Sequence, residues 1–393
     1  MKLFLACITR FHFFNQVQEL QRQGYDTNFI STYLKSSLTS PRFSQYELNP
    51  EKYISLWWLG VSFQAYLKSL AKLKRIPQIR EFFFSQFDQT TTSYINEDYD
   101  IFHGWSSMSL ECILKCKEKG VISILDRCSA HTINFHQIIS EEYEKWGLKY
   151  SAITPKLYSK EIEEYKQVDY VLVPSTYVKN TCIEQGISED RILQVPLGVS
   201  LQEFSPQPKE DDVFRVIYCG SINFHKGVQY LLKAFQELNL DNSELWLVGS
   251  VAPQFQSFLA KYESDKIIAK GYYPQTQLKF LYSQCSVFCL PSLSDGFGMV
   301  LTQAMACGLP IIYTDHTGGP DVARDGEDGF CIPIRNVEAI KEKILYLYEN
   351  SEHAKQMGQN ALKQVQQAVN WQGYGENLAQ AYESVLTSPS TSK

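Results

Sequence analysis

The chain has 393 residues, a formal net charge of −6 and a hydrophobic content of 44%. At about 150 residues per domain, this length allows two or three domains, each able to bury a full core. The acidic balance argues against a general nucleic-acid binder, which would present a basic face. The scattered cysteines form no C-x-x-C pair, which disfavours a zinc or redox centre and suits small buried thiols in a reducing cytosol.

In the first half of the chain, apolar runs typical of buried strands alternate with amphipathic runs typical of helices. The expected strands are 2–9, 26–32, 99–104, 121–126, 169–175 and 192–198, and the expected helices are 14–24, 109–120 and 176–186. The stretch 33–95, rich in aromatic and basic residues, breaks this rhythm and is interpreted as an insertion of helices. We assign 1–204 to a first Rossmann-like domain, because strands alternating with helices build parallel sheets.

The alternation restarts after the polar, proline-bearing segment 205–212, which indicates a second domain over 205–370. Its expected strands are 214–221, 243–250, 267–273, 286–292 and 310–315, with a helix over 226–238 after the first of them. Ligands of such folds bind at the carboxyl ends of the strands, so we expect a site between the two domains. The remaining segment, 371–393, is a helix followed by a polar tail.

The segment PSLSDGFGMVLTQAMACGLP, residues 291–310, predicts a loop that follows a strand and ends in a helix beginning near Gly298. The free N–H groups of Gly298, Met299 and Val300 would lie at the positive end of that helix, where they suit a phosphate. Asp295 would repel a phosphate but can accept hydrogen bonds from hydroxyl groups, and Gln303 can reach another hydroxyl. Phosphate flanked by hydroxyls describes a nucleotide sugar; the alternative is an N-capped helix without a ligand.

A second loop, in YCGSINFHKGVQYLL, places Gly220 and Ser221 after the first strand of the same sheet. Lys226 follows at the start of the next helix, where it can reach anionic oxygens at the carboxyl edge. A cation is mildly unfavourable at the positive end of a helix, so its position favours an anionic partner. The alternative is an ordinary solvated lysine.

These segments resemble glycosyltransferase family 4, whose members are retaining enzymes with the GT-B fold. YCGSINFHKGVQYLLKAF is similar to the diphosphate-binding loop and helix of the family, and PSLSDGFGMVLTQAMACGLPIIYTD, followed by TGGPDVARDGEDGFCIPI, to its signature segment. VDYVLVPSTYVKNTCIEQGISEDRILQVPLGVSLQEF resembles the end of its first domain. The resemblance implies an α/β fold of two Rossmann-like domains facing each other across a nucleotide-sugar cleft, with the C-terminal helix crossing back to the first domain.

The resemblance also implies a function: transfer of a sugar from a UDP- or GDP-sugar to a glycan, a lipid-linked acceptor or another hydroxyl acceptor. No cofactor or metal ion is expected, and no D-x-D metal motif follows a strand. The implied diphosphate ligands are Gly220, Ser221, Lys226, Gly298, Met299 and Val300; the implied sugar contacts are Asp295, Gly296 and Phe297; Gln303 would bind ribose and Tyr272 the base. Asp295, His131 and Asp126 are the catalytic candidates, and Arg10, His12 and His103 are further expected contacts in the cleft.

The sequence departs from the family pattern at several of these positions. Asp295 and Gln303 stand where the family signature has two glutamates, and Ser221 stands where an arginine is usual. Asp126 occupies the place of a histidine found in many members. These departures keep two alternatives open: a degenerate protein that binds nucleotide sugars without catalysis, and another GT-B enzyme such as an epimerase or a phosphorylase.

The segment from Tyr53 to Phe84 joins two neighbouring tryptophans to a set of basic residues: Trp57, Trp58, Lys68, Lys72, Lys74, Arg75 and Arg80. Aromatic and basic residues on one amphipathic segment suit the surface of an anionic bilayer. One interpretation is therefore a cytoplasmic protein with peripheral contact to the inner face of a membrane. The other is that the aromatic residues pack inward and the basic residues form an ordinary solvated face.

Overall fold

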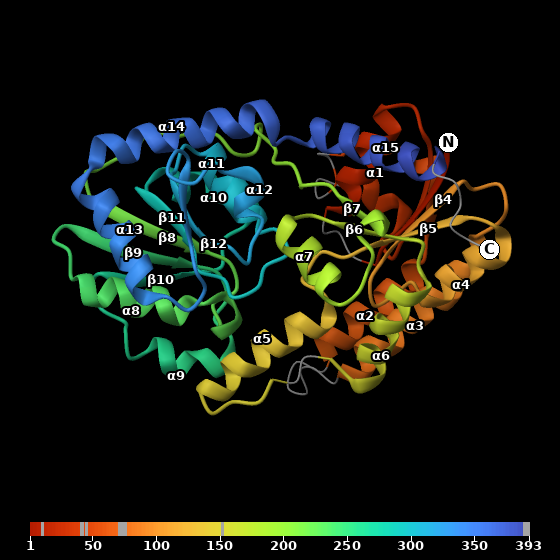
Figure 1. Cartoon of the computed structure of the whole chain (residues 1–393), viewed down its shortest axis with the longest axis horizontal. Helices are drawn as coiled ribbons and strands as arrows, with labels where there is room; N and C mark the ends of the chain where they lie inside the picture. The colour runs from red at the N-terminus through yellow and green to blue at the C-terminus, as the bar shows by residue number, and fades with distance from the viewer. Residues whose placement is uncertain (9–11, 40–42, 44–45, 70–76, 151–152, 388–393) are drawn as a thin grey trace.

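The computed structural model describes the chain except for residues 9–11, 40–42, 44–45, 70–76, 151–152 and 388–393, and except for the side chains of 64 and 66–69. Two parallel sheets with flanking helices lie side by side (Figure 1). The first has the order β3 (Tyr53–Ser55), β2 (Asp26–Ser31), β1 (Lys2–Ala6), β4 (Ile101–Trp105), β5 (Ile122–Asp126), β6 (Tyr170–Val173), β7 (Ile192–Gln194). The second has the order β10 (Ile267–Gly271), β9 (Ser243–Val248), β8 (Phe214–Cys219), β11 (Val287–Leu290), β12 (Ile311–Thr314), β13 (Gly329–Ile332). The expected α/β fold of two Rossmann-like domains is thereby confirmed.

Helices cover both faces of each sheet, which is why the strands are apolar runs rather than alternating ones. The helices that accompany the first sheet are α1 (Phe13–Arg22), α2 (Trp57–Ser69), α3 (Pro77–Thr91), α4 (Leu110–Lys119), α5 (Thr132–Lys145), α6 (Pro155–Gln167) and α7 (Thr176–Glu184). Those that follow are α8 (Val228–Leu238), α9 (Gln256–Leu259), α10 (Gln275–Ser283), α11 (Met299–Ala306), α12 (Gly319–Val322), α13 (Val337–Glu349), α14 (Ser351–Ala368) and α15 (Trp371–Thr387). Short 3₁₀ turns are η1 (Lys35–Thr39), η2 (Pro50–Lys52), η3 (Thr92–Tyr94), η4 (Glu189–Arg191), η5 (Phe224–Lys226) and η6 (Pro253–Phe255).

The stretch 33–95 contains α2 and α3, and it also contributes the strand β3, which the sequence did not predict. Each of the three residues of β3 pairs in parallel with a residue of β2, so this strand forms an edge of the first sheet. A run this short carries too little hydrophobic periodicity to be recognised without its partner.

The last two helices run back along the molecule, so that α15 packs against α1 of the first domain (Figure 1). A Cβ on Gly375 of α15 would lie 2.5 Å from Cβ of Glu19 in α1, so the close approach of the two helices requires a glycine there. The helix also buries Tyr374 and Tyr382 in the first domain, where they reach side chains of α1 and β4.

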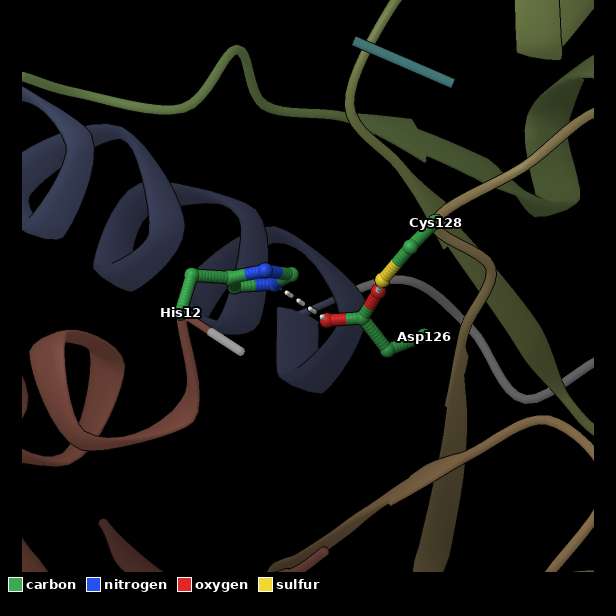
Figure 2. A group of neighbouring side chains, drawn as sticks. All are labelled: His12, Asp126 and Cys128. Carbon is green, nitrogen blue, oxygen red and sulfur yellow. Dashed lines mark hydrogen bonds and ion pairs between the residues drawn. The ribbon is translucent and has the colours of Figure 1, made fainter. Parts of the chain in front are cut away.

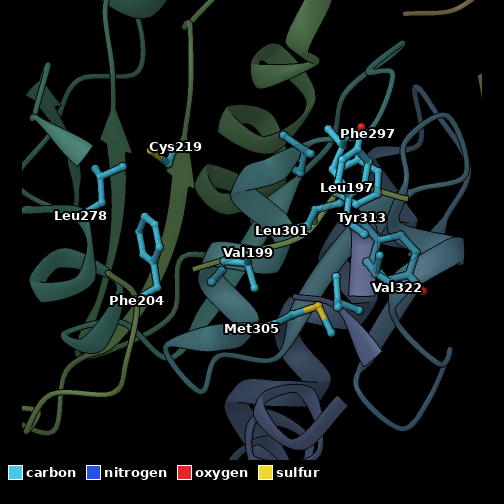
Figure 3. Packing of buried hydrophobic residues seen from close by; sticks show 14 of the residues in the cluster. Leu197, Val199, Phe204, Cys219, Leu278, Phe297, Leu301, Met305, Tyr313 and Val322 are labelled. Atoms are coloured by element: carbon cyan, nitrogen blue, oxygen red, sulfur yellow. The ribbon is translucent and has the colours of Figure 1, made fainter. Parts of the chain in front are cut away.

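The chain enters the second domain before residue 205, where the sequence places the boundary. Phe204 is 1% exposed, and its ring lies 6.3 Å from that of Tyr282 in α10. Leu197 and Val199 are buried in the same apolar cluster as Leu301 (Figure 3). Among the described helices, none combines the length and the apolar character needed to cross a bilayer.

Candidate functional site

Two loops of the second domain meet at the carboxyl end of its sheet. β8 leads through Gly220 to the turn η5, and its neighbour β11 leads into the loop that carries Asp295. Lys226 Nζ lies 2.5 Å from Asp295 Oδ2, although the two residues are 69 positions apart in the sequence. The structure thus brings together the two charged side chains that the sequence singled out in this domain.

His225 joins the same two loops beneath this ion pair. Burial, with a smaller contribution from the charge of Lys226, lowers the pKa of His225 to about 4. The ring is therefore neutral at pH 7, and its Nε2 lies 2.6 Å from the carbonyl oxygen of Ser294, to which it can donate. The N–H of Leu293 donates in turn to the carbonyl of His225 over 3.1 Å. These two hydrogen bonds hold the turn that carries Lys226 against the loop that carries Asp295.

The helix α11 begins beside Asp295, as the sequence predicts. Gly298 precedes it with φ of 78° and ψ of 62°, a left-handed conformation that a glycine adopts without strain. Within the described residues, no acceptor binds the N–H groups of Gly298, Met299 and Val300. The positive helix end is therefore available to an anion that enters next to Lys226.

The remaining predicted ligands of the second domain lie after its strands or on α11. Gly220 and the exposed Ser221 follow β8, and Tyr272 follows β10 with 75% of its surface exposed. Gln303 lies one turn into α11, is 7% exposed, and its Oε1 is 3.5 Å from the hydroxyl of Tyr282. The assignments of these residues to the diphosphate, the base and the ribose stay predictions.

The Asp295 loop contacts the carboxyl edge of the first sheet. A Cβ on Gly296 would lie 1.8 Å from the carbonyl oxygen of Cys128, just beyond β5, so only a glycine fits there. Ser175, just beyond β6, donates to the carbonyl of Gly296 over 2.6 Å. The strand ends of the two sheets therefore face each other at the loop that carries Asp295.

Asp126 ends β5 within a buried network of the first domain (Figure 2). Its Oδ2 lies 3.1 Å from Nε2 of His12, 3.4 Å from Nε2 of His103 and 3.0 Å from Nε2 of Gln16. Burial would raise the pKa of Asp126, but the two histidines outweigh it and hold that pKa well below its usual range. Asp126 is therefore ionised within this network.

Three of the expected cleft residues in the first domain have buried side chains, and their roles at the site stay predictions. His103 is fully buried, and its Nδ1 bonds to the hydroxyl of Tyr382 in α15. His12 and Asp126 are 4% and 2% exposed and face each other. All three side chains bond to residues of β4, β5, α15 or the start of α1. Arg10 lies outside the described residues.

The same network contains a set of atoms that a metal ion could use. Nitrogen of His12, a carboxylate oxygen of Asp126 and the sulfur of Cys128 lie within 4.8 Å of one another. The Cys128 thiol already donates to Asp126 over 2.9 Å, and His12 bonds to the other carboxylate oxygen. The hydrogen-bonding capacity of the carboxylate is met by these neighbours. Metal independence stays a prediction.

His131, the other catalytic candidate of the first domain, is engaged in local contacts, and its catalytic role stays a prediction. It caps α5, where its Nδ1 accepts from the N–H of Ile133 over 3.3 Å, and its ring stacks on Tyr165 at 4.2 Å. Burial, with a smaller contribution from the charge of Arg127, lowers the pKa of His131 to about 4. A neutral, stacked cap residue at 4% exposure has a structural role in the first domain.

The side chain of Phe297 is not free to bind a sugar, because it packs in the core of the second domain (Figure 3). It is 4% exposed, and a Cβ on Gly318 would lie 2.5 Å from its ring. The sequence missed this because the run Asp-Gly-Phe-Gly looks like an exposed loop. An isolated aromatic residue in a glycine-bearing loop often packs into the core and so attaches the loop to it.

Sequence comparison identifies the chain. The model of the family described as Glycosyltransferase Family 4 matches residues 11–203, and that of Glycosyl transferases group 1 matches residues 200–364. The chain belongs to glycosyltransferase family 4. The two matches meet where the chain passes from the first domain into the second. Between them they include both loops of the candidate site and the Asp126 network.

Individual members of the family are distant from this chain. It is 28% identical over 217 residues to an uncharacterized glycosyltransferase of Methanocaldococcus jannaschii, covering 55% of this chain and 60% of that one. It is 26% identical over 227 residues to the MMP alpha-(1->4)-mannosyltransferase of Mycolicibacterium hassiacum, covering 56% and 54%. The matches thus span little more than half the length of these relatives.

Solved structures share the GT-B fold over nearly the whole chain. A sucrose-phosphate synthase from Thermosynechococcus elongatus superposes with a TM-score of 0.72 at 18% identity, covering 99% of this chain and 100% of that one. Anabaena HepE in complex with UDP gives 0.70 at 12% identity, covering 98% and 100%. At these identities the likeness establishes the fold.

Proposed function

We propose that this family member is a retaining, metal-independent glycosyltransferase that uses a UDP- or GDP-sugar and a hydroxyl acceptor on a glycan or a lipid-linked saccharide. The observation that carries the proposal is the pairing of Lys226 with Asp295 beside the free N-terminus of α11. A cation, a helix end and a carboxylate within one loop cluster match a diphosphate joined to a sugar. HepE, a protein of the same fold, was solved with UDP, which supports this donor class.

In this proposal the donor diphosphate replaces Asp295 as the partner of the Lys226 ammonium. It also accepts hydrogen bonds from the N–H groups at the start of α11. Asp295 then accepts hydrogen bonds from the sugar, Gln303 binds the ribose and Tyr272 the base. The bond between the anomeric carbon and the diphosphate oxygen breaks, and the acceptor oxygen bonds to the same face of that carbon. The acceptor proton leaves with the diphosphate, whose charge the fixed donors stabilise.

A donor screen tests the proposal. Intact UDP- and GDP-sugars are compared for thermal stabilisation of the protein, and the stabilising donor is then assayed for release of nucleoside diphosphate with and without a chelator. We expect stabilisation by one base class, slow donor hydrolysis that the chelator leaves unchanged, and a product with the donor's anomeric configuration. Binding without turnover in any acceptor mixture would favour the degenerate binding protein, and a donor recovered with altered sugar stereochemistry would favour an epimerase.

We also propose that the α2–α3 region contacts an anionic membrane surface. Four large apolar side chains are exposed there: Trp57 by 49%, Trp58 by 44%, Val61 by 51% and Phe82 by 56%. Trp57 and Trp58 lie about one turn from Val61 on α2, and contiguous exposed apolar surface marks interaction sites. Of the basic residues, Arg80 lies over the ring of Phe84, while Lys72, Lys74, Arg75 and the side chain of Lys68 fall outside the described part.

Vesicle sedimentation tests this contact. The protein is expected to sediment with anionic but not neutral vesicles, to be released by added salt, and to lose binding when Trp57 and Trp58 are replaced by Ala or when Lys68, Lys72 and Lys74 are replaced by Glu. Phe280→Ala removes an aromatic side chain of 51% exposure in the second domain and serves as the matched control. Equal recovery in the supernatant with and without anionic vesicles at low salt would refute the contact.

A further inference from the structure

Glu142 is a buried carboxylate of the first domain whose partners come mainly from the second. It lies on α5 at 0% exposure, and its Oε1 accepts from Gln229 over 2.9 Å and from Tyr230 over 2.7 Å. Trp146, one turn further along, donates to the same oxygen over 2.9 Å, and Arg335 donates to Oε2 over 2.8 Å. Gln229, Tyr230 and Arg335 all belong to the second domain. A buried carboxylate with this many donors is well compensated, so removing its charge leaves the donors unsatisfied.

The contact reaches the turn that carries Lys226. Nε2 of Gln229, which bonds to Glu142, also donates to the carbonyl of Phe224 over 3.0 Å, at the start of η5. The ring of Phe224 stacks on Trp146 with centroids 5.3 Å apart. The turn that ends at Lys226 is therefore held by α5 through one hydrogen-bonded chain and one aromatic stack.

Arg335 shows how closely the second domain is fitted to α5. It is one of the described non-glycine residues with a left-handed backbone, at φ of 60°. This conformation is unfavourable for a residue with a Cβ and persists where contacts determine it. Besides Glu142, its guanidinium donates to the carbonyl of Ile138 over 3.0 Å and lies 3.4 Å from Glu141. Every one of these partners lies on α5 of the first domain.

We infer that Glu142 is a positioning residue for the donor site. From the first domain it fixes the turn that presents Lys226, and so couples the contact between the domains to diphosphate binding. This rests on the proposed function, because it assigns the purpose of that turn to the donor. Arg335 alone would be enough to compensate the charge of Glu142. The additional bond to Gln229 links Glu142 to the turn that carries Lys226.

Glu142→Gln tests the coupling with two separate measurements. The first is hydrogen exchange of the amides from 224 to 232 without nucleotide, which we expect to become faster because the turn loses its support. The second is the affinity for UDP and GDP, which we expect to fall by about fivefold or more. The KM for the donor should rise more than kcat falls, since the chemistry of the site is intact. Arg335→Gln is expected to act in the same direction, and the two changes together should be less than additive.

Glu144→Gln provides the control, because it removes the same charge from an exposed position of the same helix. It should leave both measurements unchanged. If hydrogen exchange over 224–232 is unchanged in both Glu142→Gln and Arg335→Gln, then Glu142 does not support the turn that carries Lys226. This outcome does not depend on which ligand the protein binds. Faster exchange with unchanged nucleotide affinity would overturn the positioning role. A wild-type protein that binds no nucleotide would instead refute the proposed function, while the exchange result would still decide the link between the domains.

Discussion

Replacement of Lys226 by Ala is expected to weaken binding of free UDP or GDP by about ten- to 150-fold, because a hydrogen bond to a charged group contributes about 1.5–3 kcal/mol. The variant loses the ammonium that pairs with Asp295 and leaves the carboxylate of Asp295 facing the phosphates without its partner. Titration calorimetry with each nucleotide measures the change directly. Donor affinity should fall with that of the nucleotide, since both share the diphosphate.

Lys233→Ala is the matched control, because Lys233 lies on the following helix, is 57% exposed and has its ammonium 3.8 Å from Glu237. It should leave nucleotide affinity unchanged. If Lys226→Ala bound both nucleotides as tightly as the wild type, Lys226 would have no role as a diphosphate ligand.

Asp295→Asn is expected to separate turnover from nucleotide binding. Loss of the charged acceptor for the sugar hydroxyls should reduce kcat by about ten- to 150-fold. Free UDP or GDP should bind up to about fivefold more tightly, because the nucleotide no longer competes with a partly exposed ion pair worth about 1 kcal/mol at most. Donor turnover and calorimetry with the free nucleotide give the two values.

The double variant Lys226→Ala with Asp295→Asn completes a double-mutant cycle. Asp295→Asn should recover part of the nucleotide affinity that Lys226→Ala loses. Two outcomes would contradict the assignment of Asp295 to the sugar. One is a collapse of nucleotide binding in Asp295→Asn while the fold, measured by circular dichroism, stays intact. The other is a kcat equal to that of the wild type.

The sequence was sufficient to predict most of the fold and the second-domain part of the site. Strands buried on both faces form continuous apolar runs, which can be recognised without knowing their neighbours. Lys226 and Asp295 could be found because each follows such a strand and precedes a helix, and the carboxyl ends of adjacent parallel strands meet. The direct contact between them could not be predicted, since it depends on the conformations of two loops.

The burial of the first-domain candidates could not be predicted, because the environment of each histidine is set by distant parts of the chain. His103 looked available from its neighbours in sequence, but its partner Tyr382 lies 279 residues away. Asp126 was a catalytic candidate because it stands where many family members have a histidine, and the residues that bond to it come from β4 and from the start of α1. Glu142 was overlooked because an acidic residue on an amphipathic helix is usually solvated, and nothing near it in sequence indicates that Arg335 and Gln229 will cover it.

The packing of α15 on α1 has a consequence for the order in which the protein is made. The first domain emerges from the ribosome before Tyr374 and Tyr382 are synthesised. Until then, the positions that these two rings occupy in the first domain are open to water. The strands and helices of the second domain, from β8 to α14, come from one continuous stretch of the chain that precedes α15. The domain that is translated first is therefore the one that is completed last.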